Sequence, residues 1–503
     1  MDGVTNLIGG KWLPSASGST FESRNPADLS HIIGIYARSE AQDIEAAVAA
    51  AQNAYPDWRR TPPPERAAIL FRMGQLLEKH KERLSILMVE EMGKVLVEAR
   101  GDVQEAIDMA YYIAAFGRMP FGSVVPSERR DIYCMAQRVP VGVVGLITPW
   151  NFPIAIPSWK MFPALLAGNT IVFKPAEDTP QLAIEFVRLL VEAGIPTGVV
   201  NIVTGYGQEA GAALVESQGV TTISFTGSTA TGRQIASRCG ALLKRVSCEM
   251  GGKNGIVVLD DADIDLAVKG ALWSAYGTSG QRCTAASRLI VHRDVHQKFR
   301  DALLSQVASF RVEAGTNPEA QMGPVINRAQ LDRIHSYVEL GQREGAKLLT
   351  GGKILSEGGF EKGCFYAPTL FDSMTPQMRI AQEEIFGPVT GIIEVSSFEE
   401  ALAIANGTLY GLSLSLYTQD LSRAFRAIQE LEAGIVYINL PTSGAEIQLP
   451  FGGVKQTGNG HREAGWMAMD YCTEWKSVYV NYSTSSDLVR AQIDVHPQKG
   501  HNT

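Results

Sequence analysis

The middle of the chain alternates short apolar runs with helical stretches, and this alternation constrains the fold more than any other feature. The apolar runs occupy residues 141–147, 170–173, 199–203, 222–225 and 256–259. The stretches between them have helical character at 157–167, 180–193, 208–217 and 229–239. Short β-branched strands that alternate with helices predict a parallel, doubly wound sheet, which binds its ligands at the carboxyl ends of the strands.

Two other parts of the chain have different patterns. A second alternating region begins near residue 253 and predicts a second α/β domain, with strands at 288–291, 389–394, 413–417 and 435–439. The first third is mainly helical: a capping box of Ser39 and Gln42 opens a helix that Pro56 ends, Pro64 opens a second helix, and a third covers 95–116. Strands at 132–139 and 476–482 fit neither region. Such strands often pair with a partner subunit, so we expect a homodimer or a homotetramer.

Composition and charge exclude several classes of protein. The 503 residues carry 45 Lys and Arg against 53 Asp and Glu, so we expect no nucleic-acid and no membrane partner. No apolar run reaches the roughly 18 residues of a membrane span. The N-terminus lacks a basic stretch before an apolar core, and the six scattered cysteines form no CxxC pair, which together predict a cytoplasmic protein with reduced thiols. The eight histidines form no HxH pair, so we expect no metal site.

Cys283 and Glu249 are the candidate reactive residues. Cys283 ends the segment Gly280-Gln281-Arg282-Cys283, and a loop bounded by glycine can bring a thiol to a cleft where its pKa is lowered. A single cysteine considered alone is more often a buried packing residue. Glu249 precedes a Gly-Gly turn, which suits a general base with a raised pKa, although alone a surface salt bridge would be the simpler interpretation.

Seven sequence blocks occur in order along nearly the whole chain. They are Thr148-Pro149-Trp150-Asn151-Phe152-Pro153, Phe173-Lys174-Pro175-Ala176-Glu177, Phe225-Thr226-Gly227-Ser228-Thr229, Glu249-Met250-Gly251-Gly252-Lys253, Gly280-Gln281-Arg282-Cys283, Glu384-Ile385-Phe386-Gly387-Pro388 and Pro450-Phe451-Gly452-Gly453. Each block alone is moderately specific. The ordered set resembles the NAD(P)-dependent aldehyde dehydrogenase superfamily, in particular a branch similar to semialdehyde dehydrogenases.

The resemblance implies three parts of the fold. A Rossmann-like, parallel-sheet NAD-binding domain would comprise residues 1–122 and 141–252, and a second α/β domain at 253–465 would be the catalytic domain. A small β arm for oligomerisation, with the C-terminal tail, would comprise residues 123–140 and 466–503.

The resemblance also implies catalytic roles. Cys283 would attack the aldehyde carbon as a thiolate, and the Asn151 amide and the Cys283 backbone N–H would bind the oxyanion. After hydride passes to the nicotinamide, Glu249 would activate water to hydrolyse the thioester on Cys283. Lys174 completes the predicted catalytic set. In isolation, Asn151 is also plausible as a turn residue between proline-rich flanks.

The expected cofactor is NAD, with NADP as the alternative. In the family Lys174 and Glu177 bind the adenosine ribose, and a carboxylate there accepts hydrogen bonds from a 2′-hydroxyl and repels a 2′-phosphate. An exposed Lys-Glu pair is the other interpretation. Gly227 and Ser228 open a helix whose N–H groups can meet a pyrophosphate. The full predicted set is Ile147, Thr148, Pro149, Trp150, Lys174, Ala176, Glu177, Gly207, Gly211, Phe225, Thr226, Gly227, Ser228, Glu249, Met250, Gly251, Glu384 and Phe386.

The substrate is less constrained. Arg282 could pair with a substrate carboxylate through a bidentate fork, and Glu105 could orient Arg282 or meet an amino group; a structural role for Arg282 is equally open. Phe152 and Phe451 complete the predicted substrate contacts. The Val-Gln-Glu stretch that ends at Glu105 looks like the aminoadipic-semialdehyde branch, whereas the block around Phe451 looks like succinic or ketoglutaric semialdehyde enzymes. A broad-range enzyme for aliphatic or aromatic aldehydes is the alternative.

Two positions depart from the family pattern. His461 is an extra residue in the segment after the Phe-Gly-Gly block, and Cys248 replaces a common leucine beside Glu249. We expect Cys248 to be a packing residue.

Three other activities compete with this interpretation. A CoA-acylating enzyme typically lacks the base at Glu249. A cysteine hydrolase would need a histidine base, and the next histidine after Cys283 is His292. An inactive binding protein on the same fold has no reason to retain Cys283, Glu249 and Asn151 together.

Overall fold

The computed structural model describes residues 3–119 and 121–484, which form two compact units. The first unit comprises residues 3–119 and 140–473 and holds both large sheets. The second comprises 121–139 and 474–484. The predicted boundary near residue 252 therefore lies inside the first unit, as do residues 466–473, and the division into an NAD-binding and a catalytic domain stays a prediction. The predicted tail beyond 484 lies outside the described residues.

The first sheet has seven strands in the order β11-β10-β7-β8-β9-β1-β2. Its parallel strands are β7 (Val143–Ile147), β8 (Thr170–Lys174), β9 (Val200–Ile202), β10 (Thr222–Thr226) and β11 (Arg245–Glu249). β1 (Asn6–Ile8) runs antiparallel to β9 and to β2 (Lys11–Leu13). Every residue of β7, β8 and β10 is buried, which explains their continuous apolar runs. The predicted parallel α/β sheet is confirmed.

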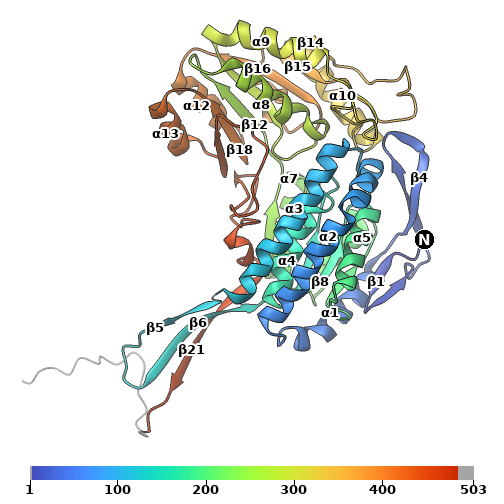
Figure 1. Cartoon of the computed structure of the whole chain (residues 1–503), viewed down its shortest axis with the longest axis vertical. Helices are drawn as coiled ribbons and strands as arrows, with labels where there is room; N and C mark the ends of the chain where they lie inside the picture. The colour runs from blue at the N-terminus through green and yellow to red at the C-terminus, as the bar shows by residue number, and fades with distance from the viewer. Residues whose placement is uncertain (1–2, 120, 485–503) are drawn as a thin grey trace, which may run out of the picture. The chain divides into compact units, whose positions relative to one another are not determined.

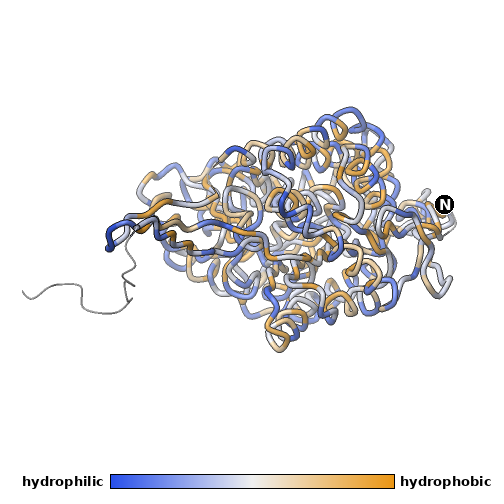
Figure 2. The backbone as a smooth tube through the Cα atoms, turned by 90° about the horizontal axis from the view of Figure 1, so that it is seen from below, coloured by the Kyte–Doolittle hydropathy of each residue, from blue (hydrophilic) through white to orange (hydrophobic). Residues whose placement is uncertain are grey.

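Helices cover both faces of this sheet. They are α1 (Ala41–Trp58), α2 (Pro63–Met92), α3 (Leu96–Ala115), α4 (Ala155–Ala167), α5 (Pro180–Glu192), α6 (Ala212–Glu216) and α7 (Thr229–Ala241). Helices α1, α6 and α7 share one apolar core with β7, β8 and β10. The long helices α2 and α3 lie side by side, and α4 and α5 pack against α2 (Figure 1). In Figure 2 the apolar stretches of the backbone run mainly inside, and hydrophilic loops surround them.

The N-terminal third differs from the prediction in two places. Besides β1 and β2 it contains the antiparallel hairpin of β3 (Thr20–Asn25) and β4 (Asp28–Ala37), which was not predicted. Helix α1 begins after Glu40, whose backbone N–H donates to the Asp43 carboxylate (3.1 Å), so the predicted Ser39–Gln42 capping box is wrong. The helix also continues through Pro56 to Trp58, whose side chain is buried, so the predicted end at Pro56 is wrong.

The second sheet also has seven strands, in the order β14-β15-β16-β13-β12-β18-β19. They are β12 (Asn254–Val258), β13 (Ala286–His292), β14 (Lys347–Thr350), β15 (Thr369–Asp372), β16 (Val389–Val395), β18 (Ser413–Tyr417) and β19 (Ile435–Ile438), and β14 alone among them is antiparallel to its neighbour. Helices α8 (Ile264–Tyr276) and α9 (Arg293–Ala308) share one core with this sheet, and α12 (Phe398–Asn406) and α13 (Leu421–Glu430) share another.

The remaining elements complete the first unit. They are α10 (Arg328–Arg343), α11 (Arg379–Gln382), the pair β17 (Tyr410–Gly411) and β20 (Val454–Lys455), and the turns η1 (Phe116–Arg118), η2 (Gly207–Gly211), η3 (Gly277–Gly280) and η4 (Trp466–Met469). No helix in the described ranges is both long and apolar enough to cross a bilayer.

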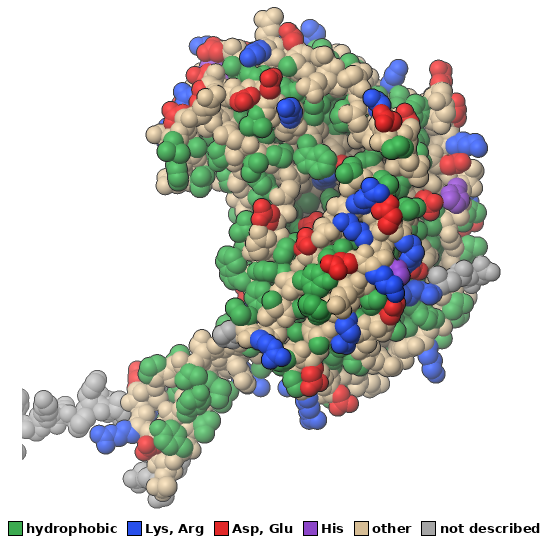
Figure 3. Space-filling view, viewed as in Figure 1, with side chains coloured by type: hydrophobic (Ala, Val, Ile, Leu, Met, Phe, Trp, Pro, Cys, Tyr) green, Lys and Arg blue, Asp and Glu red, His purple; other side chains and the backbone are tan. Residues whose placement is uncertain are grey.

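The second unit is built on a three-stranded sheet. Its strands are β5 (Gly122–Val125), β6 (Ile132–Pro140) and β21 (Thr473–Asn481), in the order β21-β6-β5. Large apolar side chains on these strands are exposed, including Val124, Tyr133, Trp475, Tyr479 and Val480, and Figure 3 shows apolar side chains gathered on this unit.

Candidate active site

A cavity of about 700 Å³ opens at the carboxyl ends of β7, β8 and β10. The segments that follow these three parallel strands meet there, as the sheet topology requires. All the predicted cofactor residues other than Glu249 line it, and so do Asn151 and Cys283. The ends of these three strands and Cys283, which follows them by 57 to 136 residues in the chain, therefore border one space.

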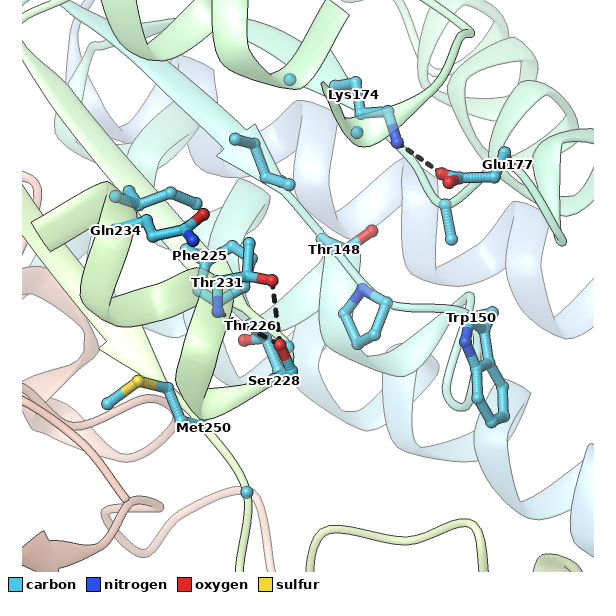
Figure 4. Close-up of a pocket in the computed structure, with 18 of the residues that line it drawn as sticks. Thr148, Trp150, Lys174, Glu177, Phe225, Thr226, Ser228, Thr231, Gln234 and Met250 are labelled. Atoms are coloured by element: carbon cyan, nitrogen blue, oxygen red, sulfur yellow. Dashed lines mark hydrogen bonds and ion pairs between the residues drawn. The ribbon is translucent and has the colours of Figure 1, made fainter. Parts of the chain in front are cut away.

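A buried cation and a half-buried carboxylate form one side of the cavity. Lys174, the last residue of β8, is buried and its Nζ lies 2.8 Å from Glu177 Oε2 (Figure 4). Asp178 follows Glu177 and also lines the cavity. Burial raises the pKa of Asp178 to about 6, although its carboxylate accepts a hydrogen bond from Asn327 Nδ2 (2.9 Å).

The N-terminus of α7 forms another side. Ser228 caps this helix: its Oγ accepts a hydrogen bond from the Thr231 backbone N–H (3.2 Å) and lies 2.9 Å from Thr231 Oγ1 (Figure 4). A helix N-terminus carries partial positive charge from its aligned peptide dipoles. Gly207 and Gly211 line the cavity from η2, and a Cβ added at Gly207 would meet nothing within 4 Å, so this wall is open for a ligand.

Several lining residues were not predicted from the sequence. Thr231, Gln234, Ile235 and Arg238 of α7 line the cavity, and their helical spacing places them on one face. With Ser228 taken as the start of the helix, this spacing would have predicted from the sequence which face of the helix lines the cavity. The others are Ile156, Asp178, Gln208, Ala212, Val215, Glu216, Gln330 and Arg333.

Glu384 and Phe386 reach the cavity from the second sheet's side. The Glu384 carboxylate accepts a hydrogen bond from the Gly252 backbone N–H (3.0 Å), and a Cβ at Gly251 would lie only 2.3 Å from Glu384 Oε2. The Gly-Gly turn therefore makes room for this carboxylate. The ring of Phe386 stands edge-on to Trp150 at 5.5 Å.

Glu249 is a buried carboxylate at the end of β11. Its Oε1 accepts no hydrogen bond from the described residues, and the side chain does not line the main cavity. Burial, and secondly the charge of Glu463, raise the pKa of Glu249 well above its ordinary value. The charges of Lys160 and Arg462 lower this pKa but have a smaller effect. Lys160 Nζ bonds the Glu463 carboxylate and Ser224 Oγ (3.0 Å), so a compact ion pair lies behind Glu249.

Cys283 follows a tightly anchored loop. The other five cysteines are buried, whereas Cys283 is half-buried and borders the cavity. Its carbonyl accepts a hydrogen bond from Asn254 Nδ2 (2.7 Å), and Asn151 Nδ2 donates to the carbonyl of Gln281 (3.0 Å). Burial raises the pKa of the Cys283 thiol above its ordinary range, and the charge of Glu249 raises it further.

The predicted substrate residues lie outside the main cavity. Phe451 packs on Trp159 with ring centroids 4.8 Å apart, and Phe152 lies beneath Lys94 Nζ at 3.7 Å. Burial, and then the charge of Asp102, raise the pKa of half-buried Glu105 to about 8.

Arg282 is not paired with Glu105, which was one of the two roles considered for that glutamate. Arg282 Nη2 donates to Glu98 Oε1 (2.9 Å) instead. The two glutamates are seven residues, or about two turns, apart on α3, so both lie on the same helix face and sequence spacing alone does not distinguish them. Arg282 borders a separate small cavity.

Neither departure from the family pattern adds a reactive group at the cavity. Cys248 is buried against Gly232, with Sγ 3.8 Å from its carbonyl oxygen, and burial raises its pKa to about 12. Burial lowers the pKa of half-buried His461.

Known proteins resemble this chain over almost its full length. The profile of the aldehyde dehydrogenase family matches residues 12–478. The chain belongs to the aldehyde dehydrogenase family. It is therefore an oxidoreductase that acts on aldehydes, as the seven sequence blocks predict.

Individual relatives agree with this assignment. The chain is 42% identical to the α-ketoglutaric semialdehyde dehydrogenase of Bacillus subtilis over 94% of its own length and 97% of the relative. It is 42% identical to the α-ketoglutarate semialdehyde dehydrogenase of Haloferax volcanii, over 96% and 100% of the two chains. The solved betaine aldehyde dehydrogenase of Staphylococcus aureus in complex with NAD+ superposes with a TM-score of 0.94, at 33% identity over 97% and 96% of the chains.

Proposed function

We propose that this aldehyde dehydrogenase oxidises a carboxylate-bearing semialdehyde to the corresponding acid with NAD as the oxidant. One observation carries the chemistry: Cys283 and Asn151 border the same cavity as the predicted cofactor residues, and Glu249 raises the pKa of the thiol from nearby. Two relatives at 42% identity are named as ketoglutarate semialdehyde dehydrogenases, which supports the substrate class.

The residues around the cavity fit a dinucleotide. Its volume, about 700 Å³, lies in the range of about 300–1,000 Å³ typical of ligand pockets. The α7 N-terminus suits a pyrophosphate, and Gly207 leaves space beside it. Lys174 and Glu177 would hold the adenosine ribose, and Glu384 the nicotinamide ribose. A solved neighbour contains NAD+ in the same fold. When bound, NAD supplies the acceptor for the hydride that leaves the aldehyde carbon.

Cys283 forms the covalent bond to the substrate. Its thiolate attacks the aldehyde carbon, a C–S bond forms, and the carbonyl oxygen becomes an oxyanion. Asn151 has two N–H donors and uses one on the Gln281 carbonyl, which leaves the other for the oxyanion together with the Cys283 backbone N–H. An amide suits this role because it donates without a full charge that would over-stabilise the intermediate.

Glu249 resolves the thioester. Because its pKa is raised, the carboxylate can take a proton from water near neutral pH, and Oε1, which accepts no hydrogen bond within the described chain, can accept that proton. The resulting hydroxide adds to the thioester carbon, and the C–S bond breaks to release the acid and the thiolate.

An amino-bearing semialdehyde is the second candidate substrate. Burial is the main cause of the raised pKa of Tyr437, and the charges of Cys283, Glu446 and Glu105 raise it further. Two acidic side chains therefore lie near the same tyrosine as the nucleophile. The charge of Glu446, and that of Glu105 above its pKa of about 8, would attract an ammonium group. Arg282, the cation expected to bind a substrate carboxylate, is engaged by Glu98.

A panel of aldehydes tests the proposed function. We expect NADH formation with kcat/KM highest for ketoglutaric or succinic semialdehyde, lower for aminoadipic semialdehyde, hexanal and benzaldehyde, and none with Cys283→Ala. A maximum for aminoadipic semialdehyde would favour the second candidate. Equal rates for all aldehydes would identify a broad-range enzyme and refute the substrate class, and turnover without NAD would refute the oxidation itself.

Glu249→Gln tests the base. The amide cannot take a proton from water, so we expect steady-state turnover to fall on the order of 10²–10⁴-fold. The first equivalent of NADH should still form, because hydride leaves before hydrolysis. Stopped-flow absorbance separates the burst from the steady state. An unchanged steady state would remove Glu249 from this role.

Glu177→Ser tests the preference for NAD over NADP. Losing a carboxylate that accepts from a 2′-hydroxyl should weaken NAD binding by about tenfold or more, since hydrogen bonds to charged groups contribute about 1.5–3 kcal/mol. Removal of the same negative charge should strengthen NADP binding. Fluorescence titration with both dinucleotides measures the two dissociation constants. Asp178→Asn is the matched control, because its carboxylate is occupied by Asn327; an equal change in both variants would contradict the assignment.

We also propose that the chain assembles as a homodimer or homotetramer through its second unit, in the cytoplasm. The exposed Tyr133, Trp475 and Tyr479 support the assembly, since exposed apolar patches mark interfaces. All six cysteines are thiols, which is usual in the cytoplasm.

Light scattering on the full chain tests the assembly. We expect a mass of two or four chains for the wild type, and a smaller mass for Trp475→Glu combined with Tyr479→Glu. Glutamates at exposed Leu421 and Phe425 of α13, in the first unit, are the control for a general effect of charge. A wild-type monomer would refute the proposal.

A further inference from the structure

The loop that carries Cys283 is strained. Thr278 and Ser279 have left-handed backbone angles (φ 51° and 56°), and Gly280 follows at φ 68°. A left-handed conformation in a non-glycine residue costs about 1–3 kcal/mol and persists only where surrounding contacts impose it. Gly280 itself cannot change, because a Cβ there would lie 2.1 Å from the carbonyl oxygen of Gly387.

Glu98 of α3 holds the strained residues. Its carboxylate accepts the Thr278 backbone N–H on both oxygens (2.9 and 3.0 Å) and lies 3.3 Å from Thr278 Oγ1. The same carboxylate accepts Arg282 Nη2 (2.9 Å). Glu98 and Arg282 are both buried, so water does not compete with these bonds.

Arg282 closes the loop on itself. Its Nε donates to Thr278 Oγ1 (3.0 Å), and the guanidinium carbon lies 4.3 Å from the ring centre of Trp273 in α8. A Cβ at Gly277 would lie 2.9 Å from the guanidinium, so the group fills the space inside the turn. Residues 278 and 282 are therefore tied to one carboxylate, and Cys283 is the next residue.

We propose that the buried Glu98–Arg282 pair is a positioning device, which holds the loop from Gly277 to Cys283 in its strained form and so aims the thiol, and that Arg282 does not recognise the substrate. The inference rests on the proposed role of Cys283 as nucleophile. It predicts that the pair acts on every aldehyde alike, because the loop geometry matters before any substrate group is recognised. A carboxylate-binding arginine would instead act only on substrates that carry a carboxylate.

Kinetics with two aldehydes separate these roles. In Glu98→Gln and Arg282→Met we expect kcat to fall by a similar factor for succinic semialdehyde and for uncharged hexanal, on the order of 10–100-fold, because misplacement of a reacting group by about 1 Å costs about 10²-fold. Arg282→Lys keeps the positive charge but loses the planar guanidinium donors, so its kcat should lie between those of the wild type and Arg282→Met. A rise in KM confined to succinic semialdehyde, with kcat unchanged, would overturn the proposal.

Alkylation of Cys283 by iodoacetamide, without aldehyde or NAD, gives a second readout. Burial raises the pKa of this thiol, so release of the loop should expose it and move the alkylation profile to lower pH in both variants. A direct effect of the lost charge would move the two profiles in opposite directions, because one variant removes a negative and the other a positive group. Opposite or absent shifts would overturn the proposal.

Glu91→Gln is the matched control. Glu91 is also buried, and its carboxylate accepts the backbone N–H groups of Gln181 (2.7 Å) and Leu182 (2.9 Å) at the start of α5, not those of the nucleophile loop. We expect it to lower the melting temperature without moving the alkylation profile. If it moves the profile as Glu98→Gln does, the effect is general destabilisation and the proposal fails. Should Glu98→Gln not fold, Arg282→Lys carries both tests. A wild type that forms no NADH with any aldehyde would refute the proposed function, while the alkylation profiles would still test the loop.

Discussion

Cys283 and Glu249 are two acidic groups near one another, and the charge of Glu249 makes ionisation of the Cys283 thiol harder. The charge of Glu249 is the second cause, after burial, of the raised pKa of the thiol, and Glu249 has a raised pKa of its own. Both groups must ionise in turn during the proposed reaction. Like-charged groups held close together ionise in sequence rather than together, so the thiolate attack and the activation of water are separated in time by the same electrostatics.

The sheet and the loop bring these groups together from different directions. Glu249 ends β11, whose register with β10 pairs it with Thr226, next to the start of α7. Cys283 comes from the loop between α8 and β13, and its position depends on α3 through Glu98. The Asn151 side chain links the first sheet to the loop that carries Cys283, because Asn151 follows β7 and its amide donates a hydrogen bond to the Gln281 carbonyl. A backbone shift in any of these elements would therefore alter the reactive geometry.

Much of the fold was predictable from local pattern. Strand β18 coincides with its predicted range, and β8, β10 and β16 differ by one residue at an end, because buried parallel strands are continuous apolar runs bounded by turn residues. The hairpin of β3 and β4 was missed because neither strand is buried throughout: β3 alternates between exposed and buried residues, and only the last two residues of β4 are buried. β11 was missed for a similar reason, since only its last three residues are buried.

The amino-acid sequence by itself determined the family and the α/β architecture, and it predicts the reactive thiol, carboxylate and amide, because these are properties of residue type and order. Only the tertiary structure decided which glutamate of α3 bonds Arg282, that Glu249 Oε1 accepts no hydrogen bond within the described chain, and that one face of α7 lines the cavity. Glu98 and Glu105 are equivalent in helical phase, and only the approach of the loop before Cys283, fixed by contacts distant in sequence, chooses between them.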